Sequence, residues 1–169
     1  SVQYVGVFVL TLQHLPLGMA TVKIIAGWMS AAILGMTRSN LTEDETQGQS
    51  ILPQGRFFRL VAAAIVGLIA VSGATRVDSM MADVGIAVSA GSLLLIGMGL
   101  LHLGVTDQAM RVSVGLMTVL AGFEVLYAAV ENSVLVAALL AIINLGLALV
   151  GAYLMIASNA TEENETEAV

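Results

Sequence analysis

The stretch that decides the fold is Val134–Ala157, which reads VLVAALLAIINLGLALVGAYLMIA. It carries no charge, and its one strongly polar side chain is the amide of Asn144. About 17–25 consecutive apolar residues is the length of α-helix that crosses a bilayer core of roughly 30 Å. This stretch therefore predicts a transmembrane helix.

The composition of the whole chain agrees with that prediction. Of 169 residues, 58% are hydrophobic and 11% are charged, whereas soluble domains average ~45–50% and ~25%. A disordered chain would contain less Leu, Val and Ile. These values favour an integral membrane protein. The absence of cysteine excludes disulfides and thiolate sites. The net charge of −6 disfavours a nucleic-acid partner, because binding phosphates requires clustered Lys and Arg.

Further apolar segments lie upstream of this stretch. Three of them are long enough to span: Leu15–Met36, Val84–Val105 and Val112–Val130. A fourth, Leu60–Ala74, is short, and it would span only with Phe57 and Phe58 added or would lie tilted or re-entrant. We expect an all-α polytopic membrane helix bundle with four to six membrane segments, five being the preferred number.

The N-terminal stretch Val2–Leu12 is followed by Pro16, which starts or kinks a helix. We therefore interpret Val2–Leu12 as an interfacial helix or as the end of a span that begins upstream. Ser1 is not followed by a basic region, so a cleavable signal peptide is not expected. A processed initiator Met and a missing upstream segment are the two explanations for this start.

These segments divide the chain into four parts. Residues 1–36 hold the N-terminal apolar segments, and residues 37–59 form a polar loop. Residues 60–157 form the membrane helix bundle. Residues 158–169 carry four of the twelve acidic residues and no hydrophobic periodicity, which predicts a disordered acidic tail.

The basic residues near the helix ends predict the orientation. If each segment crosses once, Arg38, Arg56, Arg59 and Arg111 lie on one side of the membrane and Arg76 alone lies on the other. Cytoplasmic loops carry an excess of Lys and Arg. We therefore expect the polar loop and the acidic tail in the cytoplasm and the N-terminus outside.

Two charged residues, Lys23 and Glu124, fall inside predicted spans. A centred charge costs about 2.5–3.5 kcal/mol on insertion scales, and such residues usually face the protein interior. Their depths, and that of Asn144, are compatible with an ion pair assisted by the amide. Burial favours the neutral carboxyl group and a nearby lysine favours the ionised one, so Glu124 could carry a proton. A structural ion pair or a contact to another subunit is the alternative, and Lys23 could instead extend to the membrane interface.

The remaining candidate is His102, close to Asp107 near the end of its predicted helix. It is either a proton carrier or, more often for such a histidine, a hydrogen-bonded interface residue. His14 lies near the opposite face, so the two imidazoles cannot share a haem or a metal. We find no nucleophile–base pair, nucleotide loop or paired catalytic carboxylates. The prediction is a chain with no catalytic residues, cofactor or metal.

Small residues recur at helical spacing in the predicted spans and favour close helix packing within the chain or with foreign helices. They are Ala87, Gly91, Gly97, Gly99, Gly115, Gly122, Ala137 and Ala141.

The segment Gly122–Val130, which reads GFEVLYAAV, resembles the second helix of the small K-type (chain 4L) subunit of respiratory complex I. It is similar also to the C-type subunit of multisubunit sodium/proton antiporters. The resemblance covers about residues 84–157 and implies a proton-channel carboxylate at Glu124. Ala128 and Glu131 stand where that family tends to have Asn, and the last helix has Asn144 instead of a second membrane Glu.

The leading functional prediction is a small membrane subunit of a multisubunit complex that translocates protons or sodium ions. Its partners would be other integral membrane subunits and the lipid bilayer. A structural or assembly subunit of a respiratory or photosynthetic complex is the first alternative. A small standalone secondary transporter is the second, weakened by the lack of internal repeats.

Overall fold

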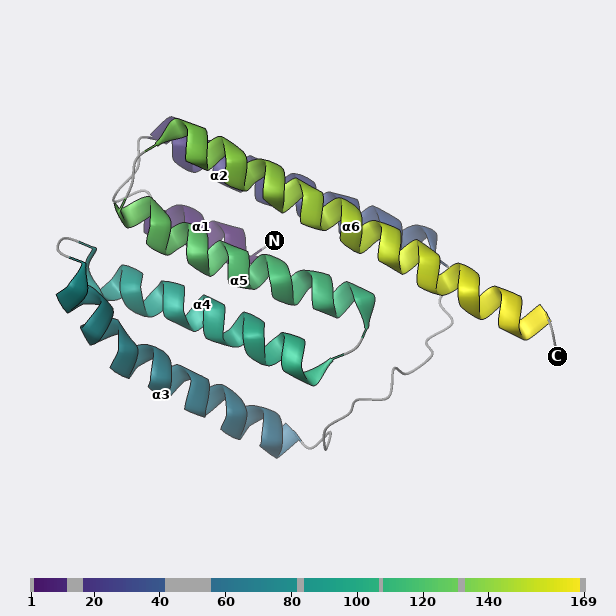
Figure 1. Ribbon diagram of the computed structural model, residues 1–169, viewed down its shortest axis with the longest axis horizontal. Helices are drawn as coiled ribbons and strands as arrows, with labels where there is room; N and C mark the ends of the chain where they lie inside the picture. Colours follow the sequence, from purple (N-terminus) through teal and green to yellow (C-terminus); the bar gives the residue numbers. More distant parts are fainter. Residues whose placement is uncertain are drawn as a thin grey trace.

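A computed structural model describes residues 2–11, 17–41, 56–81, 84–106, 108–130 and 133–167, and all regular structure in these ranges is α-helical. Six helices form one elongated bundle (Figure 1). They are α1 (Val2–Thr11), α2 (Leu17–Asn40), α3 (Arg56–Met80), α4 (Ile86–Val105), α5 (Ala109–Val130) and α6 (Val134–Glu167).

Five of these helices, α2 to α6, are long and apolar enough to cross a membrane, which confirms the all-α polytopic class and the expected number of spans. The short segment Leu60–Ala74 is the one that the sequence underestimates, because α3 has 25 residues. Polar residues extend the helix beyond Ala74: Thr75 and Ser79 donate their hydroxyls to carbonyls three residues earlier in α3. Their polar groups are satisfied within the helix, so α3 does not have to end at the apolar boundary.

The first helix, α1, runs alongside α5 and not across the end of the bundle (Figure 1). Val7 of α1 is 1% exposed and packs in one apolar cluster with Val84, Val88, Ala121 and Val125. Of the two interpretations of this segment, an interfacial helix would lie across the bundle. The observed direction is that of the membrane helices.

Successive helices run in opposite directions along the bundle, so α2, α4 and α6 run one way and α1, α3 and α5 run the other way (Figure 1). The end of α2 and the starts of α3 and α5 therefore meet at one end, which we call the arginine end after Arg38, Arg59 and Arg111. Arg38 donates a hydrogen bond to the sulfur of Met110 there, at 3.7 Å. Arg76 lies four residues before the last residue of α3, Met80, near the opposite end, which we call the Arg76 end.

Two segment boundaries differ from those predicted. The sequence predicts a polar loop over residues 37–59, whereas α2 continues to Asn40 and α3 starts at Arg56; residues 42–55 of this loop lie outside the described residues. The sequence predicts a disordered tail from Ser158, whereas the backbone is helical as far as Glu167. Ala and Glu are strong helix formers, so a membrane helix can continue past its apolar part.

Close contacts of small residues hold α4 against α5. A Cβ atom at Gly122 would lie 2.7 Å from the backbone oxygen of Ser92, and one at Gly99 would lie 2.9 Å from that of Gly115. Only glycine allows backbones to approach so closely. A Cβ atom at Gly97 would instead lie 2.6 Å from the Cγ1 atom of the Val66 side chain on α3. The sequence prediction of close packing at Gly97, Gly99, Gly115 and Gly122 is confirmed.

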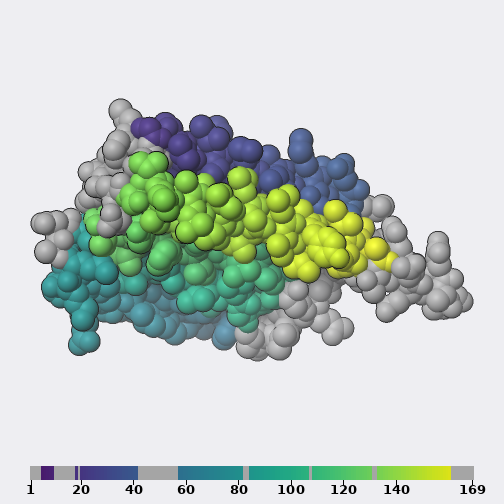
Figure 2. All heavy atoms as spheres, turned by 45° about the horizontal axis from the view of Figure 1, so that its top comes forward, coloured from purple at the N-terminus to yellow at the C-terminus, as the bar shows by residue number. Residues whose placement is uncertain are grey.

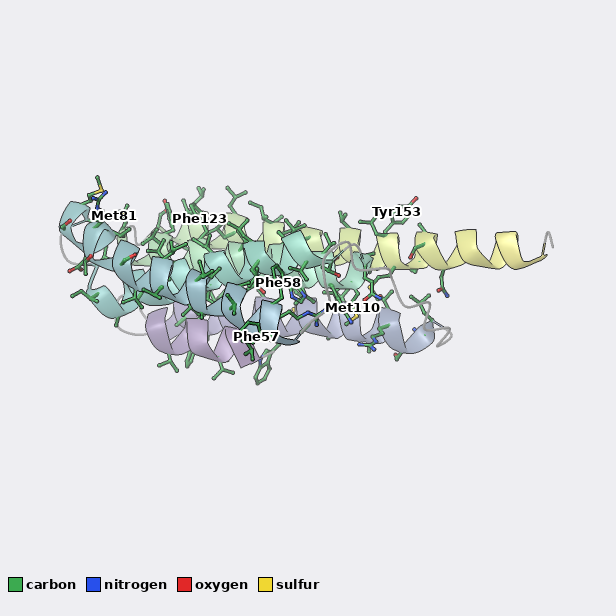
Figure 3. All side chains as sticks on the ribbon, turned by 90° about the horizontal axis from the view of Figure 1, so that it is seen from below. Phe57, Phe58, Met81, Met110, Phe123 and Tyr153 are labelled. Atoms are coloured by element: carbon green, nitrogen blue, oxygen red, sulfur yellow. The ribbon has the colours of Figure 1, made fainter. Side chains whose placement is uncertain are left out.

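The other helices complete the bundle around this pair. α6 lies along α2 (Figure 2) and packs on α5, and α3 packs on α4. α2 contacts α5 through the side chains of Lys23 and Arg38. Gly85, with φ +84°, makes the tight turn into α4 that a residue with a side chain rarely adopts. Large apolar side chains such as Phe57 and Tyr153 point outward (Figure 3), at 80% and 70% exposed. An apolar exterior is what a lipid-facing surface requires.

Candidate functional site

The candidate site is an ion pair between α2 and α5. The Nζ atom of Lys23 lies 3.7 Å from Oε2 of Glu124, and it donates a hydrogen bond of 3.3 Å to the backbone oxygen of the same residue. Lys23 is 6% exposed and Glu124 is 3% exposed. The structure thus brings together the two charges that the sequence places inside predicted spans.

The helical period explains why Glu124 faces away from α4. Gly122 and Glu124 are two residues apart, which is about 200° around a helix of 3.6 residues per turn. Since Gly122 contacts α4, Glu124 points to the other side of α5, where α2 and α6 lie. Ser113, Met117 and Ala128 share this face and are also buried. One helix therefore carries a glycine face and a face that holds the charge.

The third predicted residue, Asn144 of α6, is 2% exposed and lies near the pair. Its height follows from Gly151, where an added Cβ would meet Ser113 of α5 and, at 3.2 Å, Leu34 of α2. Lys23 precedes Leu34 by eleven residues, and Glu124 follows Ser113 by eleven. Because α2 and α5 run in opposite directions, Lys23 and Glu124 lie at the same height along the bundle, about 16 Å from the level of Gly151. Asn144 is seven residues before Gly151, about 10 Å away, which is roughly one turn from the pair.

The arrangement makes both charges tolerable in an apolar bundle. An isolated charge in low dielectric is strongly unfavourable, but a paired and hydrogen-bonded one is partly compensated. Among the described residues this is the one ion pair between helices. Removal of either partner would leave a buried charge or force its neutralisation.

His102 does not belong to this site. It lies on an exposed part of α4 near the arginine end, where Arg59 and Arg111 are the charges that act on it. Gly99 of α4 packs against Gly115 of α5, so His102 lies roughly level with the start of α5, more than ten residues from Glu124. His14 and Asp107 lie outside the described residues.

Sequence reasoning missed two buried serines on the same interface. Ser30 of α2 is fully buried and Ser113 of α5 nearly so, at 0% and 5% exposed. The spacing could have indicated them, because Ser30 follows Lys23 by seven residues and Ser113 precedes Glu124 by eleven. Seven and eleven residues are close to two and three helical turns, so each serine lies on the same helix face as the charged residue. Each hydroxyl donates to a carbonyl of its own helix, Ala26 for Ser30 and Ala109 for Ser113.

The chemistry available at this site is acid–base chemistry. Within the described part of the chain, no three His, Asp or Glu side chains gather where they could hold a metal ion. The carboxyl group of Glu124 and the amine of Lys23 can each gain or lose a proton. No protein-family model, curated protein or solved structure was found to match the chain.

Proposed function

We propose that this integral multi-pass membrane protein is a small subunit of a multisubunit complex that translocates ions, and that Glu124 carries a proton within it. The observation that carries the proposal is the buried Lys23–Glu124 pair in an otherwise apolar bundle. Intramembrane ionisable residues face protein interiors and mark ion pathways more often than they serve packing alone. The resemblance of Gly122–Val130 to the K-type and C-type subunits supports the same role.

The outer surface supports the existence of partner subunits. Several helix glycines have no neighbouring atom within 4 Å of the position a Cβ would take: Gly18, Gly35, Gly67, Gly104 and Gly146. Glycine weakens a helix and is used where a second backbone approaches. Inside the bundle, Gly99, Gly115 and Gly122 serve that purpose. The open glycines suit contact with foreign membrane helices, and α3, which packs mainly on α4, leaves most of its surface for them.

The orientation we propose follows from the arginine end. Arg38, Arg56, Arg59 and Arg111 belong to helix termini that meet there. By the excess of basic residues on the cytoplasmic side, this end faces the cytoplasm.

The test is a pair of substitutions at Glu124. Glu124→Gln keeps the shape of the side chain and an acceptor for Lys23, but it cannot bind and release a proton at neutral pH. We expect the complex to assemble and coupled ion pumping to be lost. The purified complex is identified first, by gentle extraction, a native gel and mass spectrometry of the proteins that migrate together. Unchanged proton uptake in the Gln variant would rule out the proton role.

A structural subunit is the second candidate, because a pair that neutralises itself would also clamp α2 onto α5. The same variants separate the two functions. A clamp predicts normal turnover in Glu124→Gln and loss of assembly in Glu124→Leu. If the chain migrates alone or with copies of itself, the subunit proposal fails and a small transporter becomes the leading hypothesis.

A further inference from the structure

The interface between α2, α5 and α6 carries a buried polar side chain at intervals of about one helical turn. The Lys23–Glu124 pair lies about 16 Å from the level of Ser113, Leu34 and Gly151. Asn144 lies about 10 Å from that level and Ser30, four residues before Leu34, about 6 Å from it. Ser113 is at that level. We call Glu124, Asn144, Ser30 and Ser113 the polar row.

The polar row leads from the ion pair toward the arginine end. Beyond Ser113, the contact between Arg38 and Met110 lies about one further turn along α2 and α5. The hydroxyls of Ser30 and Ser113 donate within their own helices. Each hydroxyl oxygen keeps a lone pair that can accept from a water molecule or a neighbouring side chain.

In the opposite direction the buried residues of this interface are apolar. One turn from the pair toward the Arg76 end lie Ala20 at 0% exposed and Ala128 at 4%, and Ala137 occupies the same level on α6. Beside them is the apolar cluster of Val7, Val84, Val88, Ala121 and Val125. Along α5, Glu124 is only about 9 Å from the end of the helix at Val130. The three alanines and the apolar cluster nevertheless provide no side chain that could form a hydrogen bond on this shorter route.

Resting on the proposed function, we propose that protons reach Glu124 from the arginine end along the polar row, and that the apolar layer closes the site toward the Arg76 end. A proton that enters at the arginine end passes along water and side-chain oxygens and forms an O–H bond with the Glu124 carboxylate. Release by the same row returns the proton to water and restores the carboxylate.

The side chains around Ser30 can open such a path. At its level the interface is formed by Met117 of α5 and Ala148 of α6, which pack in one cluster with Leu34. Methionine is unbranched and flexible, and alanine is small. In the proposed path, a change in the conformation of Met117 therefore admits water at this level. The charged group that faces Glu124 is Lys23 of α2. Residues 5–9 of α1 and 134–160 of α6, whose side chains the structure describes, include no charged residue.

The test measures from which side of the membrane Glu124 is protonated. A hydrophobic carbodiimide modifies protonated carboxyl groups in apolar surroundings, and mass spectrometry of the Glu124 peptide gives the rate. Native membrane vesicles of both orientations are given a step in external pH at constant internal pH. The orientation of the chain is marked by labelling Ser39→Cys with an impermeant maleimide, since the chain has no other cysteine. Glu124→Gln gives the background.

We expect acidification to accelerate modification severalfold only when it acts on the arginine end. In Asn144→Leu and Ser30→Ala the response slows severalfold. The matched control is Ser92→Ala on α4, since Ser92 is also 0% exposed and bonds within its own helix; it should behave like the wild type.

Modification that follows the pH at the Arg76 end, or equally both ends, overturns the polar row as the access path. That result leaves the proposed function standing if Glu124→Gln still abolishes pumping. Conversely, one-sided modification with normal pumping in Glu124→Gln refutes the proposed function alone. The direction of access is measured in the chain that carries only the exposed Ser39→Cys marker, so the inference is tested even where a substitution in the polar row disturbs assembly.

Discussion

The two faces of α5 hold the bundle together by different means. Toward α4, Gly115 and Gly122 bring two backbones into contact. Toward α2 and α6, Glu124 and Ser113 place polar groups in a buried interface. The first interface depends on shape, since lipid tails are as apolar as the helices and contribute no hydrophobic drive between them. The second depends on charge compensation, which can be altered by a proton.

The largest effect is expected on the polar face. Glu124→Leu leaves the Lys23 ammonium buried without its partner, and breaking such a pair costs about 3–5 kcal/mol. The double variant Lys23→Met/Glu124→Leu removes both charges and should recover most of that loss. Unfolding of the purified protein in mixed micelles measures both. A double variant as unstable as the sum of the two single variants would contradict the pairing.

On the glycine face, Gly122→Val should destabilise the protein by about 1–3 kcal/mol, the usual range for overpacking. The added side chain would meet the backbone of α4, which cannot move without separating the helices. Gly146→Ala is the control, because the space beside Gly146 is open. It should be neutral or stabilising by up to about 1 kcal/mol. Equal losses in the two variants would mean that the α4–α5 contact is not the cause.

A smaller effect is expected at the polar face of α5, where Gly151 of α6 packs against Ser113. Gly151→Ala brings a Cβ onto the side chain of Ser113, whose oxygen is the nearest atom. We expect a loss of about 1–2 kcal/mol. Ser113→Ala in the same chain should recover part of it, because residues in contact are not additive. Strict additivity in a double-mutant cycle would place the two residues apart.

The smallest effect concerns the two ends of the bundle. Ser39→Cys near the arginine end and Met81→Cys beyond α3 are both exposed, and each should change stability by no more than about 0.5 kcal/mol. An impermeant maleimide should label Met81→Cys in intact cells and Ser39→Cys only in inverted vesicles. Labelling of both residues from one side would mean that α3 does not cross the membrane.

Most of the fold could be predicted from hydropathy, because a bilayer leaves few alternatives to apolar helices. The exceptions involve polar residues that lie within a membrane helix although their hydropathy suggests that the helix has ended. Ser79 and Arg76 made α3 look too short, although Ser79 satisfies its hydroxyl inside the helix. The candidate site was predicted in part: Lys23 and Glu124 were identified because charge in a span is rare. Ser30 and Ser113 were missed, since a serine that bonds within its own helix leaves no mark in composition.

The sequence by itself determined the class of protein, a range of four to six membrane segments with five preferred, and the two residues whose charge needs a partner. It could not determine which helices are neighbours. The depth of a residue in the membrane follows from its position within its own segment, whereas contact between two helices depends on how the whole bundle packs. Only the tertiary structure decided that Lys23 meets Glu124, that Asn144 lies one turn away and that His102 lies apart. The physical reason is the glycine contact of α4, which turns the opposite face of α5 toward α2 and α6.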